Sequence, residues 1–107
     1  MNGAELIAKE RKRQIEEEGW TTEHDDGHAI GDLAVAGACY ALDFVALYGG
    51  QKGTGEVSAA HAACQLWPWD VEAYWKPTRN DPIRQLVKAG ALIAAEIDRL
   101  QRVNLHA

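Results

Sequence analysis

The sequence predicts an all-α fold, a small bundle of three to four helices with an irregular tryptophan-rich segment. Three stretches, at about 4–18, 28–48 and 82–100, have helix-forming composition or apolar residues every three to four positions. The 107 residues have room for one hydrophobic core and no second one. We therefore expect a single domain over residues 1–107.

The first predicted helix runs from Ala4 to Glu18 and ends at Gly19. Its apolar residues are few, and Arg11 lies on the same helical stripe as Ile7 and Ile15. Arg11 should therefore point toward the apolar side. The polar residues that flank this stripe are Glu10 and Gln14.

A polar linker over 20–27 should precede a second helix over 28–48. Apolar residues recur along this helix at three and four positions, as in an amphipathic helix. Alanines give one side of this helix small side chains, so a second helix can approach closely. The predicted core stripe comprises Ile30, Leu33, Gly37, Tyr40, Phe44 and Leu47.

The middle of the chain combines a glycine-rich loop with an aromatic segment. Four glycines over 49–56 predict a flexible loop, and 57–66 could form a short alanine-rich helix. Prolines and tryptophans crowd the segment 66–79, which contains Trp67-Pro68-Trp69 and Trp75-Lys76-Pro77. We expect this segment to be ordered but irregular, and held in place by its aromatic rings.

The last helix has clear start signals, because Asn80 or Asp81 can cap it and Pro82 suits its first turn. Further apolar residues extend around the other side, and a helix that is apolar almost all round is central to its fold or shared with a second subunit. We therefore expect a dimer or higher homo-oligomer. The predicted core stripe is Ile83, Val87, Gly90, Ile93, Ala94, Ile97 and Leu100.

Composition excludes several classes of protein. The hydrophobic fraction of 47% is ordinary for a globular domain, and a net charge of −5 opposes binding to duplex DNA or an anionic membrane. No 18-residue apolar run or secretory signal is present. Because Cys39 and Cys64 are isolated, we expect reduced, buried thiols and a cytoplasmic location.

The aromatic segment is the most unusual chemical feature. Its tryptophans and Tyr74 stand near Lys76, Arg79 and Arg84. Flat rings beside cations suit a nucleotide, because the base stacks while a guanidinium or ammonium group meets the phosphate. The alternative is that the tryptophans close the open end of a small bundle.

Two acidic clusters could bind a metal ion. Residues 23–28 (EHDDGH) contain five potential ligands, and Glu16 to Glu18 form an acidic run. The alternatives are a linker that caps the second helix and a solvated helix face. Neither spacing matches a strong metal-binding signature.

The pattern ER-x-RQ…EGWT-x-EHDD…WPW…WKP…LVKAGALI-x-AEI-x-RL resembles a group of small phage and prophage proteins over most of the chain. More distantly, the first and last helices are similar to those of MazG-like all-α nucleoside triphosphate pyrophosphohydrolases. That similarity implies a helical bundle, often dimeric, with a nucleotide pocket. It also implies paired carboxylates that hold Mg²⁺ against the phosphates.

The chain departs from the MazG-like pattern where those carboxylates should stand. Val35 and Ala36 follow Asp32, and Arg84 and Lys88 occupy positions where acids would be expected. The resemblance thus implies a protein of phage origin, in the cytoplasm of a bacterial host, that binds a nucleotide without catalysis or a cofactor. It could sequester a host defence signal. The predicted ligand contacts are Arg11, Trp20, Trp67, Trp69, Trp75, Lys76, Arg84 and Lys88.

Two other hypotheses follow from the same sequence. One is an active Mg²⁺-dependent pyrophosphohydrolase, with Glu16, Glu17, Asp25, Asp26 and Asp32 as metal ligands. The other is a protein–protein inhibitor of a host factor that binds through the surface of residues 67–75, because aromatic side chains dominate binding hot spots.

Overall fold

The computed structural model describes residues 1–29, 31–48 and 65–104, and within these ranges the chain is all-α without a strand. The predicted glycine-rich loop 49–56 and nearly all of the predicted helix 57–66 lie outside the described residues. The elements in chain order are α1 (Gly3–Glu18), α2 (Thr22–Asp26), α3 (Asp32–Tyr48), α5 (Val71–Tyr74) and α6 (Pro82–Asn104).

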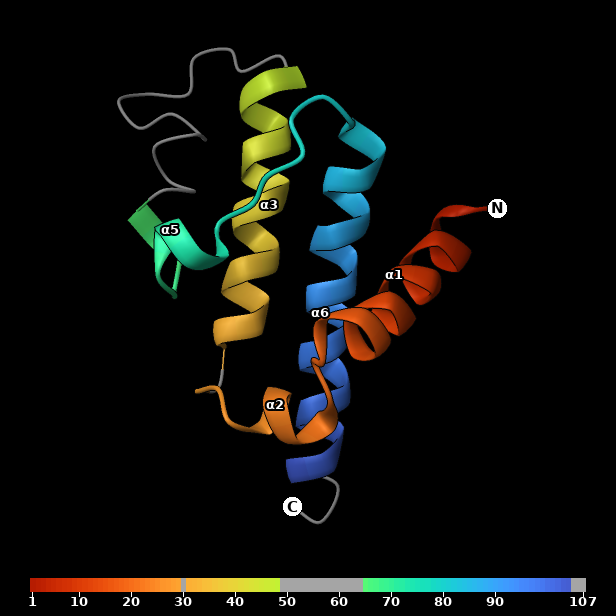
Figure 1. Ribbon diagram of the computed structural model, residues 1–107, viewed down its shortest axis with the longest axis vertical. Helices are drawn as coiled ribbons and strands as arrows, with labels where there is room; N and C mark the ends of the chain where they lie inside the picture. The colour runs from red at the N-terminus through yellow and green to blue at the C-terminus, as the bar shows by residue number, and fades with distance from the viewer. Residues whose placement is uncertain (30, 49–64, 105–107) are drawn as a thin grey trace.

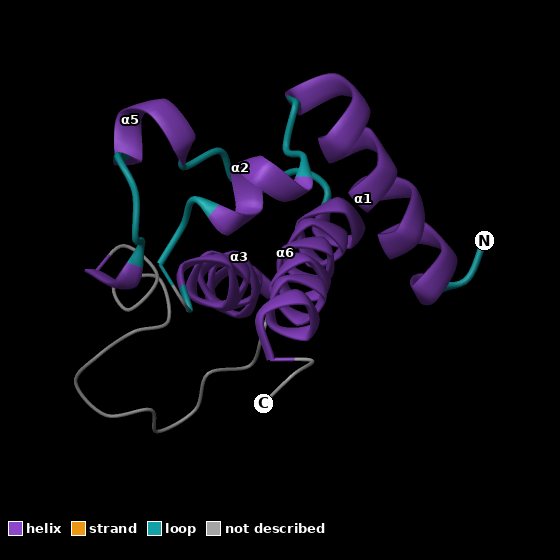
Figure 2. Ribbon diagram, turned by 90° about the horizontal axis from the view of Figure 1, so that it is seen from below, coloured by secondary structure: helices purple, strands orange, loops and turns teal. Residues whose placement is uncertain are grey.

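Helices α3 and α6 lie side by side as an antiparallel pair at the centre of the fold (Figure 1). Helix α1 packs against α6, whereas α2 and α5 occupy the flank of the pair. Figure 2 shows α2 and α5 on one side of the α3–α6 pair, and α1 along the edge of α6 away from α3. The core between these elements comprises Leu33, Ala36, Cys39, Tyr40, Trp67, Ala89, Leu92 and Ala95.

The first helix has the predicted end and a complete set of cap interactions. Asn2 and Glu5 form a capping box, in which each side chain accepts a hydrogen bond from the other residue's backbone N–H. Gly19 adopts φ 73°, a left-handed conformation that ends the helix at low cost. The prediction that this helix stops at Gly19 is confirmed.

The predicted linker over 20–27 contains a helix of its own, which the sequence analysis missed. Thr21 caps α2, since its hydroxyl accepts a hydrogen bond from the His24 N–H. The second long helix then begins at Asp32 rather than His28, because Gly31 has φ 96° and interrupts the helical path. Turn-forming residues that were assigned to a loop are therefore the cap and body of a short helix.

The predicted core stripe of the last helix is wrong. Ile83 is 65% exposed, Ile97 is 52% exposed and Ile93 is 42% exposed. The buried face carries polar residues among its apolar ones, because these polar side chains bond to segments packed on α6. That buried face comprises Gln85, Ala89, Ala91, Leu92, Ala95, Glu96 and Arg99.

The tryptophan-rich segment is ordered and irregular, as predicted, apart from the short helix α5. Gln85 fixes its end, since the Gln85 side-chain oxygen accepts a hydrogen bond of 2.7 Å from the Thr78 N–H. The Gln85 amide nitrogen donates to the Tyr40 carbonyl and to Asp43. Asp43 also pairs with Arg79 at 3.0 Å. One buried amide on α6 thus connects α3 to this segment.

Within the described part of the chain, no helix is both long enough and apolar enough to cross a bilayer.

Close contact between α3 and α6 depends on Gly37, whose added Cβ would lie 2.8 Å from the Ala89 carbonyl oxygen. Alanine normally stabilises a helix interior relative to glycine by about 0.5–1 kcal/mol. At this position we expect Gly37→Ala to lower the free energy of unfolding instead, by about 1–3 kcal/mol, because the two backbones must separate. Urea denaturation measures the change.

The matched control for that substitution is Gly3→Ala, since a Cβ at Gly3 has open space around it. The control should leave stability unchanged or slightly raised. An equal effect of the two substitutions would contradict the close packing of α3 on α6.

Candidate functional site

The candidate site is built around a buried carboxylate on α1. Glu10 is only 3% exposed, and its two oxygens accept hydrogen bonds of 2.9 Å from Nε and Nη2 of Arg13. Arg84 of α6 donates to the same carboxylate at 3.2 Å, and Gln14 at 3.3 Å. Burial by itself would raise the pKa of Glu10, but the Arg13 hydrogen bonds and the charges of Arg84 and Arg13 lower it overall.

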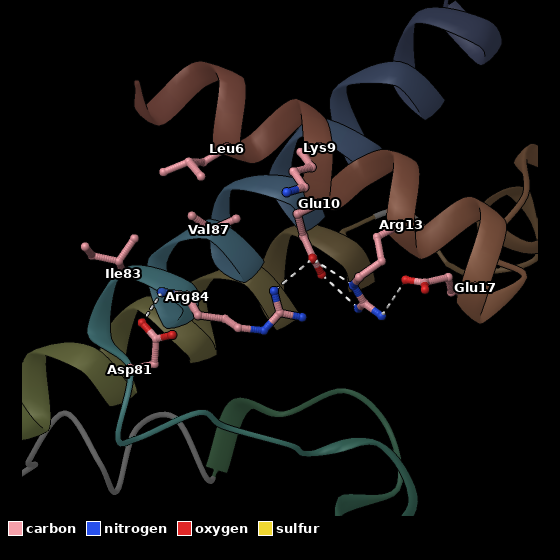
Figure 3. Close-up of a pocket in the computed structure, with 9 residues that line it drawn as sticks. All are labelled: Leu6, Lys9, Glu10, Arg13, Glu17, Asp81, Ile83, Arg84 and Val87. Carbon is pink, nitrogen blue, oxygen red and sulfur yellow. Dashed lines mark hydrogen bonds and ion pairs between the residues drawn. The ribbon is translucent and has the colours of Figure 1, made fainter. Parts of the chain in front are cut away.

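A groove of about 370 Å³ lies between α1 and α6 above this carboxylate. Figure 3 shows that the guanidinium groups of Arg13 and Arg84 both point toward Glu10, from the two helices that form the groove walls. The far end is apolar, with Leu6, Ile83 and Val87. The remaining lining residues are Lys9, Glu17 and Asp81.

A smaller cavity of about 80 Å³ adjoins the groove, and Glu10 and Arg13 line both. We call the groove and this cavity together the basic groove. The cavity adds Lys88 of α6 and Lys76 of the segment that precedes α6, and its wall includes Trp20. The remaining lining residues are Gln14, Glu18, Tyr40 and Leu92.

Lys88 is a half-buried cation of the basic groove that has no ion-pair partner among the described residues. Its ammonium group donates a hydrogen bond of 2.8 Å to the Lys76 carbonyl and lies 5.5 Å from the centre of the Tyr40 ring. Across the described residues, no carboxylate lies within ion-pair distance of it. Burial lowers the pKa of Lys88, and the positive charge of Arg84 adds to this shift. A bound anion next to Lys88 would favour its charged ammonium form.

A second pocket of about 220 Å³, here called the aromatic pocket, is lined by rings only. The Trp20 and His24 rings are parallel within 2°, with centres 5.7 Å apart, and His28 lies 4.8 Å from both His24 and Trp69. Tyr74 completes the lining. Burial lowers the pKa of His28, and the nearby His24 adds to the effect, so the neutral imidazole is favoured.

The loop that carries these imidazoles is held by α6. Arg99 is 4% exposed and donates hydrogen bonds to the Asp25 and His28 carbonyls, at 3.2 Å and 2.9 Å. Glu96 accepts a hydrogen bond of 2.6 Å from the Gly31 N–H and pairs with Arg99 at 3.3 Å. Two buried side chains of one helix therefore fix the backbone on which the aromatic pocket depends.

The predicted ligand contacts divide among three places. Lys76, Arg84, Lys88 and Trp20 come together in the basic groove, and Trp69 lines the aromatic pocket, which Trp20 also borders.

The other three predicted contacts interact with other residues of the fold. Trp67 is buried and makes an edge-to-face contact with Tyr40, and Trp75 stacks on Tyr40. Arg11 does point inward, as predicted, where it pairs with buried Asp25 at 3.5 Å. Trp67 and Trp75 thus serve the core, in line with the alternative that tryptophans complete a small bundle.

Sequence reasoning missed Lys9 and Arg13 as lining residues. It named Tyr74 among the aromatic rings, and His24 and His28 as potential metal ligands, but predicted none of the three as a ligand contact. The sequence did contain a signal for the groove, namely the polar pair Glu10 and Gln14, which are four residues apart and lie next to the apolar stripe of α1. Ile15, which was placed on that stripe, is instead 41% exposed. The helix therefore turns its polar pair inward, and Arg13 follows Glu10 into the groove.

The five acids of the metal hypothesis lie apart in different environments. Asp25 is buried against Arg11 and His24, Asp26 pairs with Arg102, and Glu16 and Glu17 lie on the exposed side of α1. Asp32 begins α3. No three His, Cys, Asp or Glu side chains converge on a possible metal position in the ranges that the structure describes.

Comparison with known proteins adds no relative: no family model, no curated protein and no solved structure matches the chain. The site must therefore be interpreted from its own geometry.

The buried Glu10 carboxylate should stabilise the fold in a pH-dependent way. Because its pKa is lower in the folded state, its contribution is present above the ordinary value of 4.5 and is lost as the pH falls through the folded-state pKa. Glu10→Gln should lower the free energy of unfolding at pH 7 by about 1–3 kcal/mol. Urea denaturation at pH 7 and pH 3.5 measures both effects.

In that experiment the difference between wild type and Glu10→Gln should shrink at the lower pH. Glu16→Gln, at an exposed position of the same helix, should change stability little at either pH. If the difference stayed constant with pH, the ionised Glu10 would not be what holds Arg13 and Arg84 in place.

Proposed function

We propose that the protein binds a nucleotide without cleaving it, with the base in the aromatic pocket and the phosphates in the basic groove. The observation that carries the proposal is the position of Trp20, which lines both the aromatic pocket and the basic groove. A ligand with a flat ring at one end and anionic groups at the other matches this pair of adjoining sites.

The phosphate end is supported by the charges of the basic groove. The groove has five cations against four carboxylates, an excess of one positive charge, although the chain as a whole has a net charge of −5. The cations are Lys9, Arg13, Lys76, Arg84 and Lys88, and the carboxylates are Glu10, Glu17, Glu18 and Asp81. Arg13 pairs with Glu10, Glu17 and Glu18, and Arg84 pairs with Glu10. In the described chain the three lysines of the groove pair with no carboxylate. Ammonium groups that lack a carboxylate partner are available to bind phosphate oxygens.

The base end is supported by the rings of the aromatic pocket. Every lining side chain is aromatic or an imidazole, and Trp20 and Trp69 stand on opposite sides of the two histidines. Stacking of a base on an aromatic side chain contributes about 1–3 kcal/mol and tolerates any base. His28, held neutral by burial, adds no charge that would oppose a neutral ring.

Binding without cleavage is supported by the state of the acids in the groove. Glu10 is bonded to Arg13 and Arg84, and Glu17 and Glu18 lie 3.8 Å and 3.0 Å from Arg13. Asp81 accepts the Arg84 backbone N–H as the cap of α6. Cleavage of a phosphoanhydride would instead require carboxylates that are available to hold Mg²⁺.

A nucleotide-binding protein with a phage-like sequence could act in the cytoplasm of a bacterial host by sequestering a nucleotide signal of antiviral defence. Sequestration needs tight binding and no turnover, which suits the arrangement proposed above. The enzyme and host-inhibitor hypotheses predict different results in the experiment below.

Thermal unfolding against linear and cyclic nucleotides, with and without Mg²⁺, tests the proposal. A ligand that binds only the folded state raises the melting temperature by mass action. We expect a metal-independent rise, with the ligand intact by mass spectrometry afterwards. Lys88→Met, which keeps the aliphatic packing on Tyr40, should weaken binding about 10- to 100-fold, the value of a charged hydrogen bond.

Two exposed positions provide matched controls. Lys12→Met removes an exposed charge from α1 outside the basic groove and should leave affinity unchanged. Tyr74→Ala should weaken binding, whereas Val71→Ala on the same short helix should not.

A Mg²⁺-dependent change with a cleaved product would replace the proposal with the pyrophosphohydrolase hypothesis. Failure of every nucleotide to raise the melting temperature would leave the host-protein inhibitor as the better account.

A further inference from the structure

Within the described residues, one face of the central helix pair is covered by none of the other helices. In Figure 2, α2 and α5 lie on one side of the α3–α6 pair, α1 lies along the edge of α6 away from α3, and none of the labelled helices lies on the side opposite α2 and α5. An amphipathic helix normally buries its apolar stripe against another element. The side chains on this opposite side therefore indicate what kind of partner fits it.

The opposite side of α6 carries large apolar side chains. Leu86, Ile93 and Ile97 follow one another at intervals of seven and four residues, which places them on one stripe of the helix. They are 42%, 42% and 52% exposed. Leu100, which is half-buried, continues the stripe. Gly90 borders the stripe but is covered by α1, since a Cβ there would lie 2.5 Å from Cδ1 of Ile7.

The neighbouring side of α3 carries small side chains. Ala34, Ala38 and Ala41 recur at intervals of four and three residues, beside the buried face that holds Leu33 and Tyr40. Ala41 is in part packed against the core. Ala38 is exposed, and Ala34 and Ala41 are half-buried. A raised stripe on α6 therefore lies beside a shallow stripe on α3. We call these two stripes together the apolar face.

We infer that the apolar face binds a second copy of this chain, an interaction separate from the nucleotide site. A two-fold axis parallel to the helices would place the raised α6 stripe of each copy over the shallow α3 stripe of the other. The result is a four-helix bundle of two chains, in which the same patch serves both partners.

Charge favours this occupant. None of the residues that form the apolar face is charged, although each chain has a net charge of −5. Elsewhere the surface holds exposed acids, such as Glu16 and Glu17 on α1, so two copies would repel each other there. The apolar face is where two like-charged chains can meet without bringing charges together.

The size of the face sets the expected strength. From Leu86 to Ile97 the stripe is about 17 Å long, and two packed helices are about 20 Å wide, which gives a few hundred square ångströms per chain. A standard interface buries about 800 Å² per partner. We therefore expect a dimer that dissociates on dilution rather than an obligate one.

Sedimentation velocity over protein concentrations from low micromolar to near millimolar tests the inference. The expected result is a reversible change from the monomer mass of 11.7 kDa to twice that value. Leu86→Lys combined with Ile97→Lys should leave only monomer, and so should Ala38→Glu, which alters the shallow stripe at an exposed position.

Val71→Lys is the matched control, because Val71 is 46% exposed on α5, on the other side of the molecule. It should dimerise as the wild type does. Far-UV circular dichroism and the melting temperature of each monomeric variant show whether it still folds. Should Leu86→Lys with Ile97→Lys unfold the chain, Ala38→Glu decides.

A wild type that stays monomeric at the highest concentration would overturn the inference and indicate that the chain itself covers the face. A dimer that survives both sets of substitutions would equally overturn it, since the copies would then meet elsewhere. Neither result depends on whether a nucleotide binds.

Discussion

Three buried polar side chains on α6 connect the central helix pair to the segments that bear the site. Gln85 bonds to the tryptophan-rich segment at Thr78, and Glu96 and Arg99 bond to the backbone over 25–31. Buried polar groups are costly unless they are hydrogen-bonded, and their partners here are largely backbone groups of irregular segments. These hydrogen bonds satisfy the buried polar side chains of α6. They also satisfy backbone N–H and C=O groups that lie outside the helices or at a helix end.

This arrangement explains how so short a chain maintains two adjoining pockets. The aromatic pocket combines residues 20–28 with residues 69–74, which no regular element joins directly. Each half is fixed to α6 independently, one by Arg99 and the other by Gln85. Glu10 does the same for the basic groove, since it binds Arg84 of α6 as well as Arg13 of its own helix. Buried hydrogen bonds thus hold the segments that line each pocket, while the rings or cations of those segments remain accessible.

The sequence predicted the long helices well, because capping residues and apolar periodicity are local signals. Gly19 was predicted correctly as the end of α1, and Asp81, one of the two cap candidates for the last helix, is the residue that caps it, whereas the Asn2 cap was not predicted. The buried face of α6 could not be predicted in the same way. Periodicity identifies apolar stripes, and here the exposed stripe is the more apolar one. The burial of Arg99 depends on carbonyls 71 and 74 residues distant, for which a single sequence contains no signal.

Hydrogen exchange in an Arg99→Met variant tests most directly whether α6 holds the pocket loop. Methionine fills much the same space but donates no hydrogen bonds to the Asp25 and His28 carbonyls. Amides over 25–31 should exchange at least about tenfold faster, as expected when charged hydrogen bonds are lost, while those in the middle of α3 keep their protection. Arg102→Met, which breaks only the more exposed pair with Asp26, should leave both regions unchanged. Unaltered exchange over 25–31, or an equal acceleration throughout the chain, would contradict the account.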